Sequence, residues 1–270
     1  MRATGEIEVP GARLRYETAG SGSPVLLLHA AVTDRRMWEP VVPALVDAGL
    51  RPIWYDLRGF GESPTEDVEF SPRADLIAVL DALDLSRVVV AGNSRGGLIA
   101  LDAALEYPER ILGLIHIGAF ISGLDRATTP AEAVLFEAMQ TAHRAGDALA
   151  EARIDARLWL DGPTAAQGRV GGEVREAFIS MDLPNCASGR VEGRPVPLNP
   201  PADERLGELR IPVLAVVGDW DLVAAQAAAE RLESAVTRAH RVVVPGVGHL
   251  MPLEAPDVTA RLIAEFVTSA

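Results

Sequence analysis

One serine in a glycine-rich turn is the residue of this sequence with the clearest capacity for chemistry. The stretch Gly92-Asn93-Ser94-Arg95-Gly96 matches the pattern G-x-S-x-G. The apolar run Val88 to Ala91 before it predicts a buried strand, and the segment after it predicts a helix. Such a turn exposes the serine hydroxyl beyond the end of a sheet, where the helix N-terminus favours developing negative charge. The pattern therefore predicts Ser94 as a nucleophile, the alternative being a plain glycine-rich turn.

A serine hydroxyl needs a base to take its proton before it can attack a carbonyl carbon. His249 lies in a glycine-rich segment, Gly246 to Pro252, just after the last predicted strand. That position is at the carboxyl edge of the sheet, where ligands of parallel sheets gather. We therefore predict His249 as the base. The other histidines stand in strands, helices or turns more typical of structural or solvated side chains: His29, His116, His143 and His240.

The base in turn needs a carboxylate that fixes its tautomer and stabilises the imidazolium. The predicted strand Val213 to Val217 ends in Gly218-Asp219-Trp220-Asp221, which supplies two candidates. We favour Asp221 because it lies further into the loop, and expect Asp219 to cap the turn. Asp125, just past the preceding strand, is a third candidate. The order serine, aspartate, histidine is that of α/β-hydrolases rather than of the unrelated serine proteases.

Two backbone N–H groups are needed to stabilise the oxyanion that forms during attack. One is expected from Arg95, the residue after the nucleophile, and the other from Ala31, in the loop after the strand Val25 to His29. His29 itself is expected to pack or hydrogen-bond within that turn.

The elements that must position these residues alternate between short apolar strands and helical segments. This alternation predicts a mostly parallel sheet covered by helices. The alternation stops after Phe120: residues 129–188 contain helical stretches and no convincing strand. We therefore predict an α/β core formed by residues 1–120 and 206–270, with residues 121–205 inserted as a helical cap over the site. A longer surface connection is the alternative.

Composition excludes several classes of function. The chain has 270 residues and a formal net charge of −13, and its cations are scattered arginines, so nucleic-acid binding is not expected. It contains no lysine, which excludes a Schiff-base lysine and a P-loop lysine. Cys186 is the sole cysteine, which fits a reducing compartment. No apolar run is long enough to span a membrane, and the first residues lack the pattern of a signal peptide. A cytoplasmic location is therefore expected. Dispersed histidines predict no metal site, and no cofactor is expected.

With these residues in place, the chain resembles the α/β-hydrolase superfamily over essentially its whole length. The resemblance rests on four segments: Leu27-Leu28-His29-Ala30 followed by Met37-Trp38, Tyr55 to Ser63, the serine turn, and Gly248-His249 before Pro252-Leu253-Glu254. It implies an eight-stranded, mostly parallel sheet with helices on both faces, and a structural role for Asp56 and Arg58. It also favours Asp221 over Asp219, since the acid of relatives usually lies three residues past the glycine that ends the strand.

Within that superfamily, residues 33–40 and the modest cap resemble 3-oxoadipate enol-lactonase-like esterases. The resemblance implies cleavage of a small ester or lactone through an acyl-enzyme. Gly92 to Gly97 also resembles hydrolases that cut carbon–carbon bonds in ring-cleavage products, although Leu250 stands where those usually have tryptophan. An aspartate at position 94 would imply epoxide or haloalkane chemistry. A non-hydrolytic catalyst on the same residues and a binding protein without turnover remain alternatives.

The substrate is expected to be a small molecule. Arg95 is unusual after the nucleophile; its stem either packs under the cap or its guanidinium binds a substrate carboxylate. Oligomeric state is not predicted. Aromatic and sulfur-containing side chains that either line an apolar pocket or pack ordinarily are Phe120, Phe136, Trp159, Trp220 and Met251.

Overall fold

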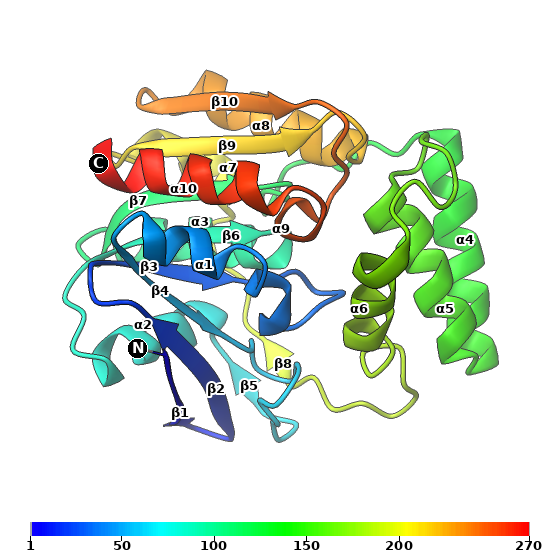
Figure 1. Ribbon diagram of the computed structural model, residues 1–270, viewed down its shortest axis with the longest axis horizontal. Helices are drawn as coiled ribbons and strands as arrows, with labels where there is room; N and C mark the ends of the chain where they lie inside the picture. The colour runs from blue at the N-terminus through cyan, green and yellow to red at the C-terminus, as the bar shows by residue number, and fades with distance from the viewer. Residues whose placement is uncertain (1, 270) are drawn as a thin grey trace.

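The protein is described here by a computed structural model covering residues 2–269, and its centre is one eight-stranded sheet (Figure 1). The strand order is β1-β2-β4-β3-β6-β7-β9-β10, in which β1–β2 and β2–β4 are antiparallel and the other pairs are parallel. The predicted sheet is therefore confirmed. These strands are β1 Arg2–Val9, β2 Ala12–Ala19, β3 Ser23–Leu28, β4 Leu50–Tyr55, β6 Val88–Asn93, β7 Ile111–Ile117, β9 Val213–Gly218 and β10 Ala239–Val244; β5 Glu69–Phe70 and β8 Arg194–Pro195 form a separate two-stranded sheet.

Helices cover both faces of the sheet because its central strands are apolar on both sides. Along β3, Leu26 and Leu28 pack into one core and Val25 and Leu27 into the other. The helices α2, α3 and α8 contribute to the first core, and α1 and α10 contribute to the second. Their bounds are α1 Val42–Asp47, α2 Pro72–Ala82, α3 Arg95–Glu106, α8 Val223–Ala235 and α10 Pro256–Ser269, with the short helices α7 Ala202–Arg205 and α9 Met251–Glu254 and the 3₁₀ turns η1 Arg35–Trp38 and η3 Leu206–Glu208 beside them.

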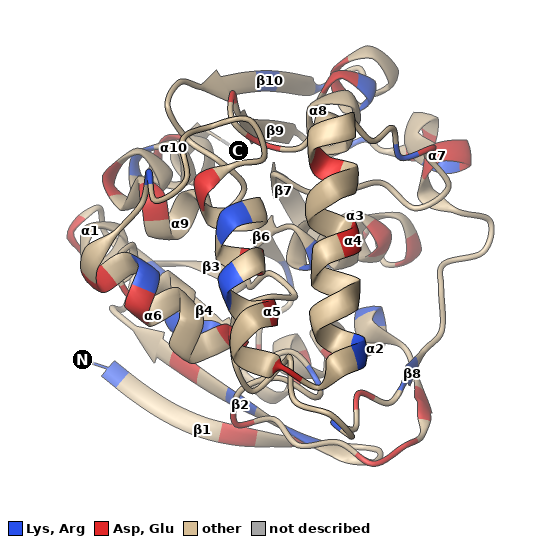
Figure 2. Cartoon of the chain, turned by 90° about the vertical axis from the view of Figure 1, so that its right-hand side faces the viewer, with Lys and Arg blue, Asp and Glu red and all other residues tan. Residues whose placement is uncertain are grey.

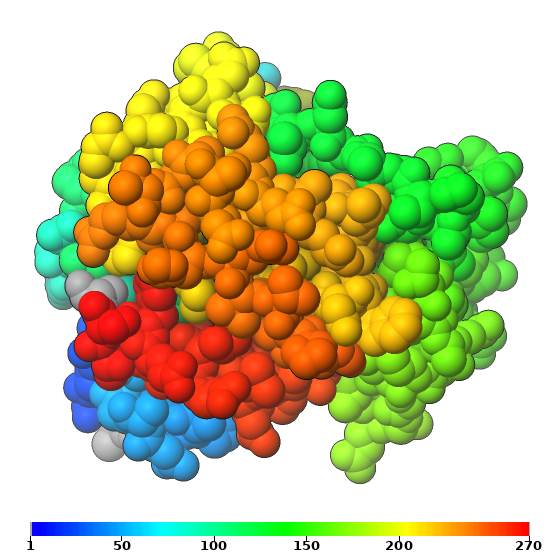
Figure 3. All heavy atoms as spheres, turned by 90° about the horizontal axis from the view of Figure 1, so that it is seen from above, coloured from blue at the N-terminus to red at the C-terminus, as the bar shows by residue number. Residues whose placement is uncertain are grey.

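A layer of helices lies beyond the carboxyl ends of the parallel strands (Figure 1). We call it the helical layer; it consists of α4 Pro130–Ala145, α5 Ala148–Asp155, the π-helix η2 Ala156–Asp161 and α6 Gly172–Asp182. Figure 2, which looks along the strands, shows α4 and α5 in front of β6 and α3. In Figure 3 the same helices stand out as a lobe beside the sheet. The layer therefore covers the edge at which β6 meets α3.

Local signals explain where several helices begin. Ser71 accepts a hydrogen bond from the Ala74 N–H and is followed by Pro72, as expected for the start of α2. Thr129 and Glu132 form a reciprocal capping box at the start of α4. No helix among residues 2–269 combines the length and apolar character needed to cross a membrane.

Candidate active site

The turn between β6 and α3 holds Ser94 in a strained conformation. Ser94 has φ 54° and ψ −116°, in a region that non-glycine residues rarely occupy. Its backbone N–H donates to the Ile117 carbonyl on the neighbouring strand (2.9 Å). A Cβ on Gly92 would lie 2.3 Å from the Gly96 carbonyl carbon, and one on Gly96 would lie 2.3 Å from the Leu28 carbonyl oxygen. Both glycines are therefore required by close backbone approach.

His249 and Asp221 are in direct contact at the carboxyl edge of the sheet. His249 Nδ1 lies 2.7 Å from Asp221 Oδ1, and the two side chains are 1% and 0% exposed. The carboxylate also accepts a hydrogen bond from the Leu222 N–H (2.7 Å). Among the described residues, His249 Nε2 is buried without a hydrogen-bond partner. Because Nδ1 donates to the carboxylate, Nε2 keeps the lone pair that a base needs.

Neighbouring side chains fix the position of the imidazole. The Trp159 ring lies 4.8 Å from it and the Phe120 ring 6.0 Å from it, the latter nearly parallel. Asn93 Nδ2 donates to the His249 carbonyl and to the Ile117 carbonyl, both at 2.9 Å. Asn93 therefore ties the histidine loop to the strand next to the serine turn. The sequence does not single out Asn93, since this contact joins residues 156 positions apart.

Ser94 and His249 line the same cavity, whose volume is about 480 Å³. That volume is in the range of small-molecule sites. Four further candidates named from the sequence also line it: Ala31, Arg95, Phe120 and Trp159. Arg95 is the first residue of α3, so its backbone N–H faces the N-terminal end of that helix.

Three residues proposed from the sequence as pocket residues do not line this cavity. Met251 is 1% exposed and belongs to the core beneath the sheet edge. Trp220 lies close to Gly162: a Cβ added to that glycine would be 3.0 Å from the Trp220 Cβ. Phe136 packs edge-on against Trp159, with ring centres 6.0 Å apart, and so contacts a residue of the cavity wall. These contacts depend on the tertiary fold, which residue type alone does not predict.

The remaining polar candidates have structural contacts. Asp219 Oδ1 accepts a hydrogen bond from the Gly246 N–H (2.7 Å), as expected for a turn-capping carboxylate. His29 uses both ring nitrogens on the backbone: Nδ1 bonds the Ala30 carbonyl and Nε2 accepts from the Leu57 N–H. Burial lowers the pKa of His29, and lowers that of His116 to about 4. Asp125 is exposed.

Two further structural groups match their expected roles. Asp56 is fully buried and bonds the Arg35 guanidinium at 2.6 Å. Arg58 pairs with Asp75 at 2.8 Å. Both pairs therefore hold loops near the site, and the Arg58–Asp75 pair also lies in the cavity wall.

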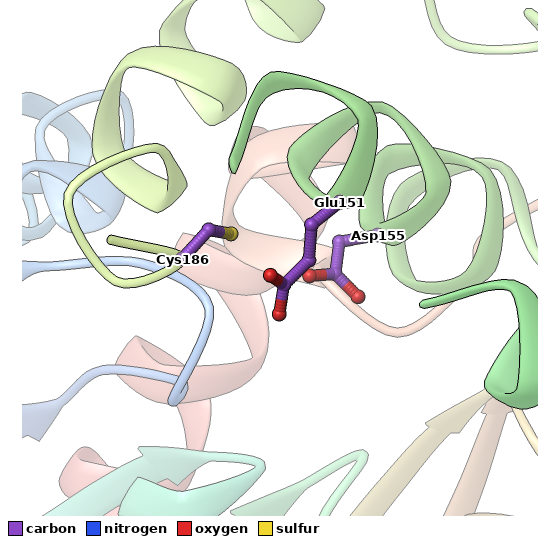
Figure 4. A group of neighbouring side chains, drawn as sticks. All are labelled: Glu151, Asp155 and Cys186. Carbon is purple, nitrogen blue, oxygen red and sulfur yellow. The ribbon is translucent and has the colours of Figure 1, made fainter. Parts of the chain in front are cut away.

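A buried cluster in the helical layer contains metal-ligand types (Figure 4). Glu151 and Asp155 lie side by side on α5, and the Cys186 sulfur points toward them. Burial raises the pKa of Asp155 to about 6 and raises the pKa of Cys186, which favours protonated forms, whereas a metal ligand must be deprotonated. The groups also have protein partners: Asp155 Oδ1 accepts from Trp159 Nε1 (2.9 Å), and Glu151 contacts His143 Nδ1 (3.0 Å). This donor set fits a hydrogen-bonded cluster better than a metal centre.

Comparison with known proteins identifies relatives over the whole chain. A family model described as the alpha/beta hydrolase family matches residues 25–262. A putative 2-succinyl-6-hydroxy-2,4-cyclohexadiene-1-carboxylate synthase of Bacillus subtilis is 27% identical over 95% of this chain and 96% of its own. A bifunctional epoxide hydrolase of Sus scrofa is 38% identical over 38% of this chain, and that match spans 19% of its own length.

Solved structures give the same result. A thermophilic esterase from Thermogutta terrifontis, described as malate-bound, aligns over 99% of this chain and 98% of its own, with 28% identity and a TM-score of 0.75. The enol-lactonase from Burkholderia xenovorans aligns over 98% of this chain and all of its own, with a TM-score of 0.77; its 23% identity supports the fold alone.

Proposed function

The chain belongs to the alpha/beta hydrolase family, and we propose that it is a serine hydrolase that cleaves a small ester or lactone with Ser94, His249 and Asp221. One observation carries this proposal. The His249 imidazole is held by Asp221 through Nδ1 at 2.7 Å, and its Nε2 has no hydrogen-bond partner within residues 2–269. His249 and Ser94 line the same cavity. A histidine held in this way can activate a serine hydroxyl that comes within hydrogen-bond reach of Nε2. No hydrogen bond joins Ser94 Oγ and Nε2 among the described residues, so a small side-chain movement must bring them together during the reaction.

The proposed reaction has two acyl-transfer steps. Ser94 Oγ attacks the carbonyl carbon while His249 Nε2 takes its proton, and the oxyanion accepts hydrogen bonds from the backbone N–H groups of Ala31 and Arg95. His249 returns the proton to the leaving oxygen, which leaves an acyl-enzyme. A water molecule then gives its proton to His249 and attacks the ester, and the acid departs as Ser94 regains its proton. Asp221 orients the imidazole in both steps.

The helical layer completes the site in this proposal. Trp159 of η2 lines the cavity and contacts the His249 ring, so in this proposal residues 121–205 act as a cap that limits the access of bulk solvent to the reacting atoms. The serine at position 94 supports ester or lactone cleavage over epoxide opening, although epoxide hydrolases are among the relatives. No cofactor is required by this mechanism.

A direct test combines turnover with covalent labelling. The wild type is expected to hydrolyse p-nitrophenyl esters or lactones and to be labelled by a fluorophosphonate at one site. Ser94→Ala removes the nucleophile, so it is expected to lose turnover by about three orders of magnitude or more and to lose the label. Retention of either signal in Ser94→Ala would rule out Ser94 as the nucleophile.

A non-hydrolytic reaction on the same three residues is the second candidate. It is favoured by the full-length similarity to a protein described as a putative synthase. Ring-cleavage dienones and carboxylated cyclohexadiene precursors belong in the same substrate panel. Turnover of such a compound without uptake of solvent ¹⁸O would favour this candidate over hydrolysis.

A further inference from the structure

The cavity beside Ser94 and His249 carries positive charge that the protein does not neutralise. Four arginines line it within the described part of the chain: Arg58, Arg73, Arg95 and Arg126. Arg58 is paired with Asp75, and Arg73 with Glu106. Neither Arg95 nor Arg126 forms an ion pair or a side-chain hydrogen bond with any residue of 2–269. The cavity thus presents two guanidinium groups whose donors are free.

Aromatic rings hold both of these guanidinium groups at the cavity. The Arg95 guanidinium lies 5.2 Å from the centre of the Phe60 ring, and that of Arg126 lies 4.4 Å from the centre of the Phe120 ring. Both rings belong to the cavity wall. A cation–π contact does not use the guanidinium N–H groups as hydrogen-bond donors, so they stay available to a ligand.

Both arginines are close to the proposed reacting atoms. Arg95 directly follows Ser94 in the chain. The Phe120 ring is 4.4 Å from the Arg126 guanidinium and 6.0 Å from the His249 ring, so the guanidinium lies within about 10 Å of the imidazole centre. A bound molecule of modest length can therefore reach Ser94 with one end and an arginine with the other.

The acidic groups near the cavity leave a positive balance. Asp75 is engaged by Arg58, and Glu192, whose negative charge favours the charged form of Arg95, is paired with Arg190 at 3.2 Å. Asp102 also lines the cavity; it accepts a hydrogen bond from Ser122 at 3.1 Å, and burial raises its pKa to about 6. The chain as a whole has a net charge of −13, whereas the unpaired charges of this cavity include two arginines. The cavity is therefore a positively charged region of a negatively charged protein.

We propose that Arg95 and Arg126 form an anion subsite, and that the substrate is a small ester or lactone carrying a carboxylate a few carbons from the scissile carbonyl. The subsite binds that carboxylate through guanidinium N–H donors, and the apolar wall formed by residues such as Leu98 and Ile99 contacts the spacer. This inference rests on the proposed hydrolase function for the cleavage step, but the subsite can be tested without turnover.

Two esters that differ only in charge test the inference by kinetics. Phenyl hydrogen glutarate carries a carboxylate, and phenyl 5-methylhexanoate has an isopropyl group in its place. The wild type is expected to prefer the half-ester by at least about tenfold in kcat/KM, because a charge-assisted hydrogen bond contributes about that factor. Arg95→Gln and Arg126→Gln are each expected to lower this preference about threefold, mainly through a higher KM for the half-ester, and the double variant to abolish it.

Arg261→Gln is the matched control. Arg261 is exposed on α10, forms no ion pair within residues 2–269 and does not line the cavity, so this variant makes the same change in net charge elsewhere. It is expected to keep the wild-type preference. A wild type that cleaves both esters equally well, with a ratio unchanged in the variants, would overturn the subsite and leave the hydrolase function standing.

Binding to Ser94→Ala separates failure of the subsite from failure of the proposed function. Calorimetry on this variant is expected to show the half-ester binding at least about tenfold more tightly than the neutral ester, and to show that preference lost on adding Arg95→Gln and Arg126→Gln. Equal affinities for the two esters would overturn the subsite. A clear binding preference with no hydrolysis by the wild type would instead keep the subsite and refute the hydrolase.

Discussion

At the scale of single residues, the serine turn requires glycines on both sides of Ser94, because there is no room for a side chain at those positions. Ser94 adopts a positive φ, and the turn fits only because Gly92 and Gly96 carry no Cβ where backbone atoms of other residues approach to 2.3 Å. The strain of the turn is offset by the packing of β6 and α3 around it. A methyl group at Gly92 would force the strand and the helix apart.

Gly92→Ala is therefore expected to destabilise the protein by more than about 2 kcal/mol, as overpacking of a rigid site does. Urea denaturation followed by circular dichroism measures this loss. Gly207→Ala is the control, because nothing lies within 4 Å of a Cβ there and its φ is not positive. Equal stability of the two variants would contradict the close approach at position 92.

The residues of the candidate site differ in how far the sequence identifies them. Ser94 is marked by its local pattern, and His249 and Asp221 by their positions after predicted strands, so the sequence could nominate them before any contact was known. Asn93 and Arg126 have no such pattern. Their importance arises only because the fold brings them beside the His249 carbonyl and the Phe120 ring.

At the scale of elements, a pair of buried acids joins two helices of the helical layer. Asp155 ends α5 and Asp182 ends α6, and the two side chains share a hydrogen bond. Burial, together with the neighbouring charge of Asp155, raises the pKa of Asp182 far above its ordinary value. Asp155 also accepts the Trp159 indole N–H, so the pair supports a side chain of the cavity wall.

This pair makes stability depend on pH in a defined direction. The folded protein holds a proton on Asp182 that the unfolded chain releases above the ordinary aspartate pKa of 3.8. The stabilisation is therefore complete below about pH 4 and is lost as pH rises toward the raised pKa. Asp182→Asn cannot ionise and can still donate to Asp155. It is expected to be more stable than the wild type at pH 8 and to vary less in stability between pH 4.5 and pH 8.

Thermal melting across this pH range measures the effect, with Asp47→Asn as the control. Asp47 is exposed and forms no ion pair among the described residues. Asp47→Asn is expected to follow the wild-type curve. A variant Asp182→Asn with the wild-type pH slope, or with lower stability at pH 8, would refute the shared proton.

Element boundaries were predicted well where capping and periodicity agree. The sequence indicates one helix from about Trp38 to Asp47, but the structure has the 3₁₀ turn η1 followed by α1, because Pro40 and Pro43 interrupt the backbone hydrogen bonds. The sequence also favours one helix from Ala148 to Leu160, but in the structure α5 ends at Asp155 and the chain continues as the π-helix η2, a change of winding that hydrophobic periodicity does not reveal. The two-residue strands β5 and β8 are too short for any periodic signal.

At the scale of the whole molecule, charge governs behaviour in solution. The net charge of −13 keeps molecules apart near neutral pH, and the isoelectric point from the sequence is about 4.9. Solubility is therefore expected to be lowest near pH 5 and to rise on either side. Turbidity across a pH series, with light scattering to separate aggregation from unfolding, measures it. High solubility at pH 5 with a minimum elsewhere would contradict this view of the surface.

The sequence predicts the succession of strands and helices along the chain better than it predicts which strands pair in the sheet. Strand–helix alternation indicates a parallel sheet, yet it does not reveal that β7 pairs with β9 across an intervening segment of about 95 residues. That pairing brings the loops after β7 and β9 to the same edge. The cap boundaries at residues 121–205 and the cytoplasmic location remain predictions.

The contact of the Trp159 indole with the His249 ring, 4.8 Å between centres, gives the protein an intrinsic optical probe. A protonated imidazole quenches tryptophan emission more strongly than a neutral one. Trp38 and Trp54 are fully buried in the core and supply a constant background, and the variant Trp220→Phe removes the remaining, partly exposed tryptophan. Changes in emission during turnover would then report the charge on the histidine in real time, without any attached dye.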